Sequence, residues 1–71
     1  MNKINPRKLI NSKWTAITPK EKQKHFLVTK VKFDELGVVS LCLLEAVLTR
    51  AQYQIDWHEL TNEQKWLFGW R

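Results

Sequence analysis

Residues 37–49, GVVSLCLLEAVLT, form the longest apolar stretch of this 71-residue chain. Three leucines in it are spaced for one side of a helix, and LLEAVL contains good helix formers. Valines toward both ends and the glycine at its start favour a strand instead. We therefore expect a long, largely buried β-strand over 38–49, and a mainly β fold. The alternative is an α+β fold in which residues 38–50 are helical.

The segments on either side of this run have the alternation of half-buried strands. Residues 25–34, HFLVTKVKFD, precede a turn in which Gly37 can adopt positive φ. We expect one face of this strand to carry Leu27, Thr29, Val31 and Phe33. The predicted architecture is a small antiparallel sheet of three to four strands, near 13–17, 25–34, 38–49 and 53–57.

Short helical turns are predicted where capping residues occur. Asn5-Pro6 begins one over 6–11, and the capping-box spacing of Thr18 and Glu21 begins another over 19–24. The same spacing at Thr61 and Gln64 predicts a C-terminal helix over 61–68 that packs across the sheet. The expected helical turns thus lie at the N-terminus, between the first two strands and at the C-terminus.

The size of the chain limits what it can do. Residues 1–71 predict a single small domain, and ordering such a chain costs on the order of 100 kcal/mol. Cys42 is the only cysteine, so no disulfide within the chain offsets this cost, and the four tryptophans are first interpreted as core residues. The sequence contains neither an apolar span of membrane length nor a secretory signal pattern, which predicts a cytoplasmic protein with no membrane partner.

Charge is distributed unevenly along the chain. Residues 1–32 carry nine Lys/Arg against the single Glu21, within a net charge of +5. Lysines on a β-face beside aromatic rings are typical of single-stranded nucleic-acid binding, in which charge follows phosphates and rings stack on bases. The candidate face consists of Lys13, Lys20, Lys22, Lys24, Lys30, Lys32 and Trp14. Exposed lysines also keep sheets from pairing edge to edge, so a merely solvated surface is the alternative.

Several stretches resemble a known family over nearly the whole chain. They are SKWTAITP at 12–19, KHFLVT at 24–29, LEAVLTR at 44–50, IDW at 55–57 and the closing W-x-x-G-W that ends at Trp70. Together they are similar to a family of short, tryptophan-rich bacterial proteins that form a domain of unknown function. The resemblance implies a free-standing bacterial cytoplasmic domain and supplies no activity or catalytic residue.

Few residues offer chemistry. Asp56, His58 and Glu59, with His25, could be metal ligands or acid–base groups, but their spacing matches no metal motif. A turn-capping Asp56 and a surface His58 are the favoured interpretation. Cys42 lies in the apolar run and is expected to be buried. We therefore predict no catalytic, cofactor or metal site, and no enzyme activity.

The closing tryptophans, Trp66 and Trp70, are the candidate anchors for a protein partner, because aromatic side chains dominate many interfaces. A non-enzymatic protein-interaction module is the leading functional hypothesis, and single-stranded RNA or DNA binding through the basic half is the alternative. The chain is expected to be a monomer or a homodimer.

Overall fold

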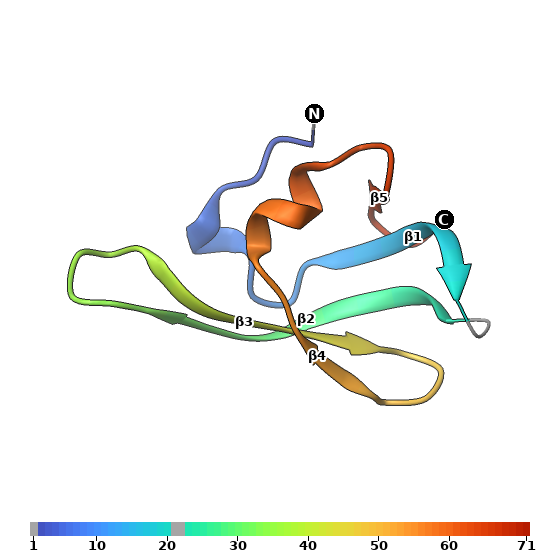
Figure 1. Cartoon of the computed structure of the whole chain (residues 1–71), viewed down its shortest axis with the longest axis horizontal. Helices are drawn as coiled ribbons and strands as arrows, with labels where there is room; N and C mark the ends of the chain where they lie inside the picture. The colour runs from blue at the N-terminus through green and yellow to red at the C-terminus, as the bar shows by residue number, and fades with distance from the viewer. Residues whose placement is uncertain (1, 21–22) are drawn as a thin grey trace.

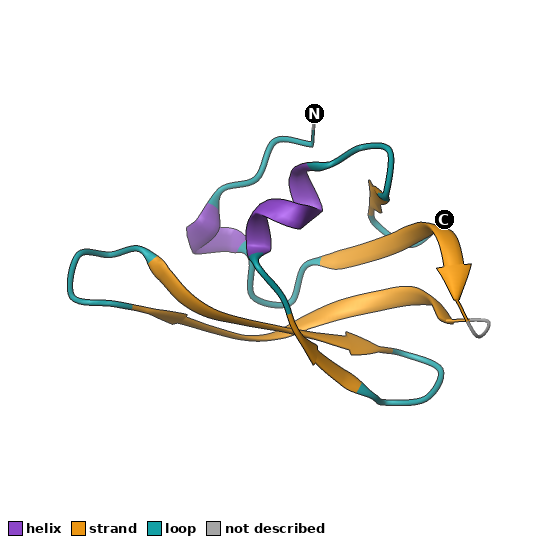
Figure 2. Ribbon diagram, in the orientation of Figure 1, coloured by secondary structure: helices purple, strands orange, loops and turns teal. Residues whose placement is uncertain are grey.

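The computed structural model describes residues 2–20 and 23–71, and within them it shows one five-stranded antiparallel sheet (Figures 1 and 2). The strand order is β4-β3-β2-β1-β5. The elements are η1 (Pro6–Lys8), β1 (Lys13–Lys20), β2 (Gln23–Phe33), β3 (Val39–Ala46), β4 (Gln52–Gln54), η2 (Trp57–Thr61) and β5 (Trp66–Phe68), where η denotes a 3-10 helix. The mainly β prediction is confirmed, with five described strands rather than three to four.

The central apolar run is a strand, as the valines predicted, and the helical alternative over 38–50 is wrong. It forms β3, which pairs with β2 on one side and with β4 on the other. Cys42, Leu44 and Ala46 are buried, whereas the intervening residues Leu41 and Leu43 are half-buried on the opposite face. The run ends at Ala46 in a turn rather than at Thr49.

A β-bulge changes the expected face pattern of β2. Val28 is opposite Leu44 and Lys30 is opposite Leu43, so Thr29 is an extra residue in the ladder. Val31 consequently packs against the core on the same side as Val28. Leu27, which precedes the bulge, lies on the opposite face from Val31, so the expectation that Leu27, Thr29, Val31 and Phe33 share one face is wrong.

The helical turn expected over 19–24 is also wrong for its described residues. β1 continues through Lys20 and β2 begins at Gln23, the two being paired with each other. A register irregularity between Thr15 and Lys20 accommodates the extra residues of β1. The non-local pairing of two strands outcompetes the local capping signal. Glu21 of that capping box lies outside the described residues.

The C-terminal prediction fails in a similar way. The expected strand 53–57 ends at Gln54, and Trp57 begins η2, with Asp56 as its N-cap. Instead of a helix over 61–68, the chain forms β5, which pairs with β1 (Figure 2). β5 thereby covers an edge of β1 that would otherwise remain unpaired.

Local signals at two turns are confirmed. Asn5 caps η1, its side chain accepting a hydrogen bond from the Arg7 backbone N–H at 3.0 Å. Gly37 has a φ of 80° in the β2–β3 turn. The Asp34 carboxylate closes that turn by accepting backbone hydrogen bonds from Leu36 and Val38.

Among the described residues, the core lies on one side of the sheet. The covered face is defined by Trp14, Phe26, Val28, Cys42, Leu44 and Ala46, which pack beneath Leu9 and Leu60 of the 3-10 segments. Figure 1 shows both 3-10 helices on this side. The open face carries the alternate residues, including Lys13, Thr15, Leu27, Lys30, Lys32, Leu41 and Leu43. No helix of the described residues is long and apolar enough to cross a membrane.

Candidate functional site

The end of the chain folds back across the open face. Gly69, with a φ of 83°, reverses the chain after β5. Thr15, which is 1% exposed, then donates its hydroxyl hydrogen to the Gly69 carbonyl at 2.7 Å and accepts the Arg71 backbone N–H at 2.9 Å. His25, paired opposite Thr15, places its Nε2 3.0 Å from the Arg71 carbonyl. The terminus is thus attached to β1 and β2 by side chains of both strands.

This attachment holds Trp70 on the open face with part of its ring in solvent. Its indole Nε1–H donates to the Phe26 carbonyl at 2.9 Å, and 44% of the residue is exposed. The Lys13 ammonium lies 4.8 Å from the centroid of the Trp70 ring, in cation–π geometry. A cation and an aromatic surface are therefore adjacent.

The candidate nucleic-acid residues separate in the structure. Lys13, Lys30 and Lys32 are exposed on the open face, and Lys24 is exposed at the start of β2. Lys22 lies outside the described residues, as does the side chain of Lys20. Trp14 is only 1% exposed and belongs to the covered face. Its ring is buried against Phe68, so the expectation that it stacks on bases is corrected.

An aromatic groove opens on the covered side, beside η2. Its aromatic members are Phe26, Tyr53 and Trp66, and its volume is about 690 Å³. The Phe26 ring lies edge-on to Trp66, 5.2 Å between centroids, and 6.4 Å from Tyr53. Leu44 also lines the groove, while its polar lining includes Gln54, Glu59 and Lys65. Concave apolar surfaces with a few polar groups are where ligands usually bind.

The two proposed aromatic anchors consequently belong to different surfaces. Trp66 is half-buried in the groove, whereas Trp70 lies on the open face. The indole of Trp66 is held edge-on to Phe26, and its backbone carbonyl accepts the Asn2 side-chain amide at 2.9 Å.

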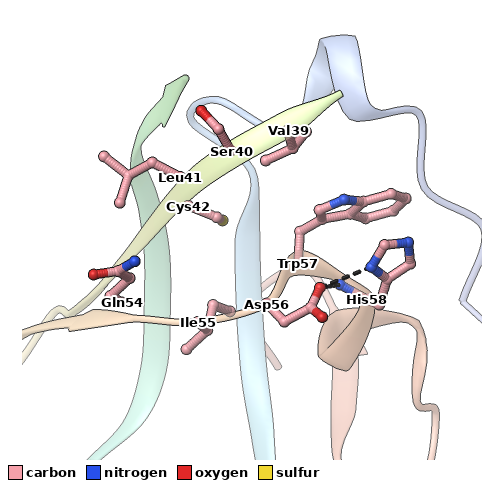
Figure 3. Close-up of a pocket in the computed structure, with 9 residues that line it drawn as sticks. All are labelled: Val39, Ser40, Leu41, Cys42, Gln54, Ile55, Asp56, Trp57 and His58. Atoms are coloured by element: carbon pink, nitrogen blue, oxygen red, sulfur yellow. Dashed lines mark hydrogen bonds and ion pairs between the residues drawn. The ribbon is translucent and has the colours of Figure 1, made fainter. Parts of the chain in front are cut away.

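A second hollow lies where β4 leaves β3 for η2. Figure 3 shows Val39 and Cys42 pointing toward Trp57 across it, with Leu41 directed away. The Cys42 thiol is buried, as expected, and burial raises its pKa, with a smaller contribution from the nearby Asp56 carboxylate. Such a thiol is a poor nucleophile at neutral pH.

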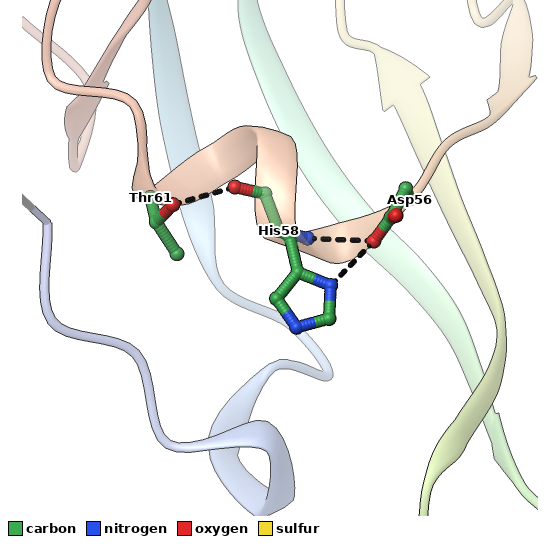
Figure 4. Close-up of polar contacts among 3 residues, drawn as sticks. All are labelled: Asp56, His58 and Thr61. Carbon is green, nitrogen blue, oxygen red and sulfur yellow. Dashed lines mark hydrogen bonds and ion pairs between the residues drawn. The ribbon is translucent and has the colours of Figure 1, made fainter.

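Asp56 and His58 are in contact, but in a capping arrangement. The Asp56 carboxylate accepts a hydrogen bond from the His58 backbone N–H at 3.0 Å and lies 2.7 Å from Nδ1 of the His58 ring (Figure 4). These two hydrogen bonds, the backbone one first, lower the pKa of Asp56. At the other end of η2 the Thr61 hydroxyl donates to the His58 carbonyl. His25 lies on the open face, so the proposed four-residue group is not assembled; the described residues contain no cluster of three metal-ligating side chains.

Comparison with known proteins agrees with the tryptophan pattern. The profile of a family described as tryptophan-rich protein (DUF2389) matches residues 12–71, the part of the chain that contains the whole sheet. The chain belongs to this family. The family is a domain of unknown function, and no curated protein or solved structure matches the chain.

The tryptophans of this tryptophan-rich protein have distinct positions. Trp14 is in the core, Trp57 begins η2 and packs partly against the core, Trp66 lines the groove and Trp70 lies under Lys13. The sequence does not reveal the groove, because Phe26 and Tyr53 meet only through the pairing of β2, β3 and β4. The available signal was the apolar alternation in the two segments that contain Phe26 and Tyr53.

Proposed function

We propose that this tryptophan-rich protein is a non-enzymatic interaction module that binds an extended segment of a partner protein in the aromatic groove. The observation that carries the proposal is the aromatic cluster that lines the groove, in which Phe26 is buried, Trp66 is half-buried and Tyr53 is 42% exposed. Tyrosine and tryptophan are enriched among the residues that dominate binding energy, since they offer large rigid surfaces.

The surroundings of the groove favour an extended peptide as the occupant. β4 borders it and, within the described residues, pairs with β3 alone, so its second edge has backbone groups without a strand partner. A peptide laid along this edge can form main-chain hydrogen bonds while an apolar side chain enters the hollow above Leu44. The Gln54 amide and the Glu59 and Lys65 charges can then pair with polar groups of the peptide.

The reactive side chains support a binding role rather than catalysis. The only thiol, Cys42, is buried and its pKa is raised. The Asp56 carboxylate and the His58 backbone are engaged in capping η2. These groups therefore contribute to the fold, and the groove offers contact surface.

The test is selection of random 12-residue peptides displayed on phage against the folded domain, followed by titration of one selected peptide. Tyr53→Ala should weaken that peptide about tenfold or more, as removal of a dominant aromatic contact does. Leu48→Ala is the matched control, since Leu48 is exposed on the same β3–β4 hairpin but outside the groove. It should leave affinity unchanged.

Thermal unfolding of both variants establishes that they are folded, and amide chemical-shift changes locate the peptide on the wild-type domain. Shifts centred on Phe26, Tyr53 and Trp66 support the proposal. Failure to enrich any peptide, or equal affinities for the two variants, would refute the groove as a peptide site.

A further inference from the structure

We propose that the open face is a second binding site, for single-stranded RNA or DNA, and that Trp70 rather than Trp14 is its base-stacking residue. The open face is opposite the groove, so nucleic-acid binding on it is independent of peptide binding in the groove.

The cations of the open face are available to a ligand. Lys30 and Lys32 are exposed and directly opposite Leu43 and Leu41 in the sheet register, and Lys13 is exposed on β1. Within the described residues no ion pair joins these three ammonium groups to a carboxylate, and Lys13 lies over the Trp70 ring. An extended phosphate backbone can therefore neutralise them without breaking an existing ion pair.

Acidic side chains lie mainly elsewhere. Asp34 is in the β2–β3 turn, whereas Asp56 and Glu59 belong to η2 on the covered side. On the open face, Glu45 is paired with Leu27 of β2, which in turn is paired with Lys13 of β1, and a Glu45 carboxylate oxygen accepts the Gln52 side-chain amide at 3.3 Å. Leu27 therefore separates this carboxylate from Lys13 and Trp70, and the end of the face that carries them is complementary to an anion.

Trp70 has the geometry of a stacking platform. Its indole N–H is fixed to the Phe26 carbonyl, which sets the ring orientation without covering the ring, and 44% of the residue remains exposed. The Lys13 ammonium, 4.8 Å from the ring centroid, is close enough for a base stacked on Trp70 to have its phosphate beside a cation. Stacking on aromatic rings combined with lysine–phosphate contacts is how single strands are held without sequence preference.

The platform is built before any ligand arrives. Thr15, buried beneath the terminus, binds both Gly69 and Arg71, and His25 contacts the Arg71 carbonyl. Trp70 lies between these two attachment points, so its position is fixed from both sides. A ligand therefore does not have to order the terminus on binding, which favours affinity.

A nucleic acid fits these features better than an acidic peptide does. An acidic peptide would use the lysines but has no flat base to cover the exposed ring of Trp70. A single strand offers a phosphate and a base at every nucleotide, and so engages both features of the face. Half-buried Leu27, Leu41 and Leu43 add an apolar surface between the cations.

The experiment titrates labelled 15-nucleotide oligo(dT) and oligo(rU) with the full chain at several salt concentrations. Three phosphate contacts predict a log–log slope of about −2, or an affinity loss of about twentyfold between 50 and 200 mM salt. Changing Lys13, Lys30 and Lys32 together to Gln should abolish most of this salt dependence. The matched control changes Lys3, Arg7 and Lys8 to Gln, which removes the same charge from exposed positions in and before η1, away from both the open face and the groove.

The role of Trp70 is tested first on the wild-type protein, by following the four indole N–H signals by NMR during the titration. The Trp70 signal should shift while that of buried Trp14 stays constant. Trp70→Ala should weaken binding about tenfold, and Trp70→Phe, which keeps a ring, by less. Comparing the affinities for oligo(rU) and oligo(dT) distinguishes RNA from DNA as the ligand, since both offer the same phosphate backbone.

Three results would each overturn the inference. One is absence of binding to either oligonucleotide up to about 100 μM protein at 50 mM salt, which is weaker than ordinary non-specific binding. Another is an equal loss in the two triple variants, because net charge rather than the open face would then explain binding. The third is a Trp70 indole signal that stays constant while an oligonucleotide saturates the protein, or that moves only when an acidic peptide is titrated in place of the oligonucleotide.

Discussion

Replacing two adjacent leucines of β3 by alanine tests the register of the whole sheet. Leu44 is 2% exposed and packs on the covered face, whereas Leu43 is half-buried on the open face. The two residues are chemically identical neighbours in one strand, so only the face to which each points distinguishes them. A one-residue slip of β3 would exchange their roles.

The expected magnitudes follow from burial. Leu44→Ala removes the equivalent of three buried methylenes, about 2.4 kcal/mol at 0.8 kcal/mol each, and leaves a cavity, so the total loss should be about 3–4 kcal/mol. Leu43→Ala removes surface that is already partly in water and leaves a space that solvent can fill, so we expect about 1 kcal/mol.

Urea unfolding at 10 °C, followed by tryptophan fluorescence, measures both losses. A domain of this size has a free energy of unfolding of about 4–10 kcal/mol, so Leu44→Ala remains measurable near the temperature of maximum stability. Unfolding midpoints on heating should fall by roughly 12–32 °C for Leu44→Ala and by roughly 4–8 °C for Leu43→Ala. Equal losses, or a larger loss for Leu43→Ala, would show that the face assignment of β3 is incorrect.

Three further predictions concern turns, pH and the terminus. Gly37→Ala should destabilise by about 1 kcal/mol in urea titration, because the added Cβ meets no atom within 4 Å and only the positive φ is penalised; Gly37→Asn should cost less. Because the pKa of Asp56 is lowered on folding, its cap stabilises above the ordinary carboxyl pKa and is lost as pH falls through the folded value. Between pH 5 and pH 2 the free energy of unfolding should therefore fall less for Asp56→Asn than for the wild type, and an unchanged pH dependence would contradict this. Thr15→Val should cost about 1–2 kcal/mol, since two backbone groups of the terminus lose their partner, and should make Trp70 more accessible to acrylamide quenching.

The parts of the fold that could be predicted from the sequence are those decided locally. The strand character of β3 follows from its valines, and the turn before it from Gly37 and the Asp34 side chain. The start of η1 follows from Asn5 followed by proline. At the two turns the residues that create the signal also make the stabilising contacts, whereas Val38 and Val47 lie outside β3 and are exposed.

The remaining parts depend on partners that are distant in sequence. Thr61 and Gln64 have capping-box spacing, yet residues 66–68 pair with β1, more than fifty positions away. A short strand along an otherwise open edge satisfies the backbone groups of both segments and places Trp66 against Phe26. Local sequence cannot reveal the pairing of residues 66–68 with β1, so propensity and capping favour a helix over 61–68.

The single residue Thr29 decides how the core is separated from the basic face. With uninterrupted alternation, Phe26 and Val28 would share a face with Lys30 and Lys32, and β2 would have to bury lysines or expose a phenylalanine. The bulge at Thr29 shifts the phase, so that Val31 continues the core while the lysines point to the side that carries Lys13 and Trp70. Period-two counting cannot locate an extra residue in a ladder, which is why Trp14 and the lysines looked like neighbours on one face. The lysines could be named from the sequence, but their separation from Trp14 becomes visible only once the register of β2 against β3 is known.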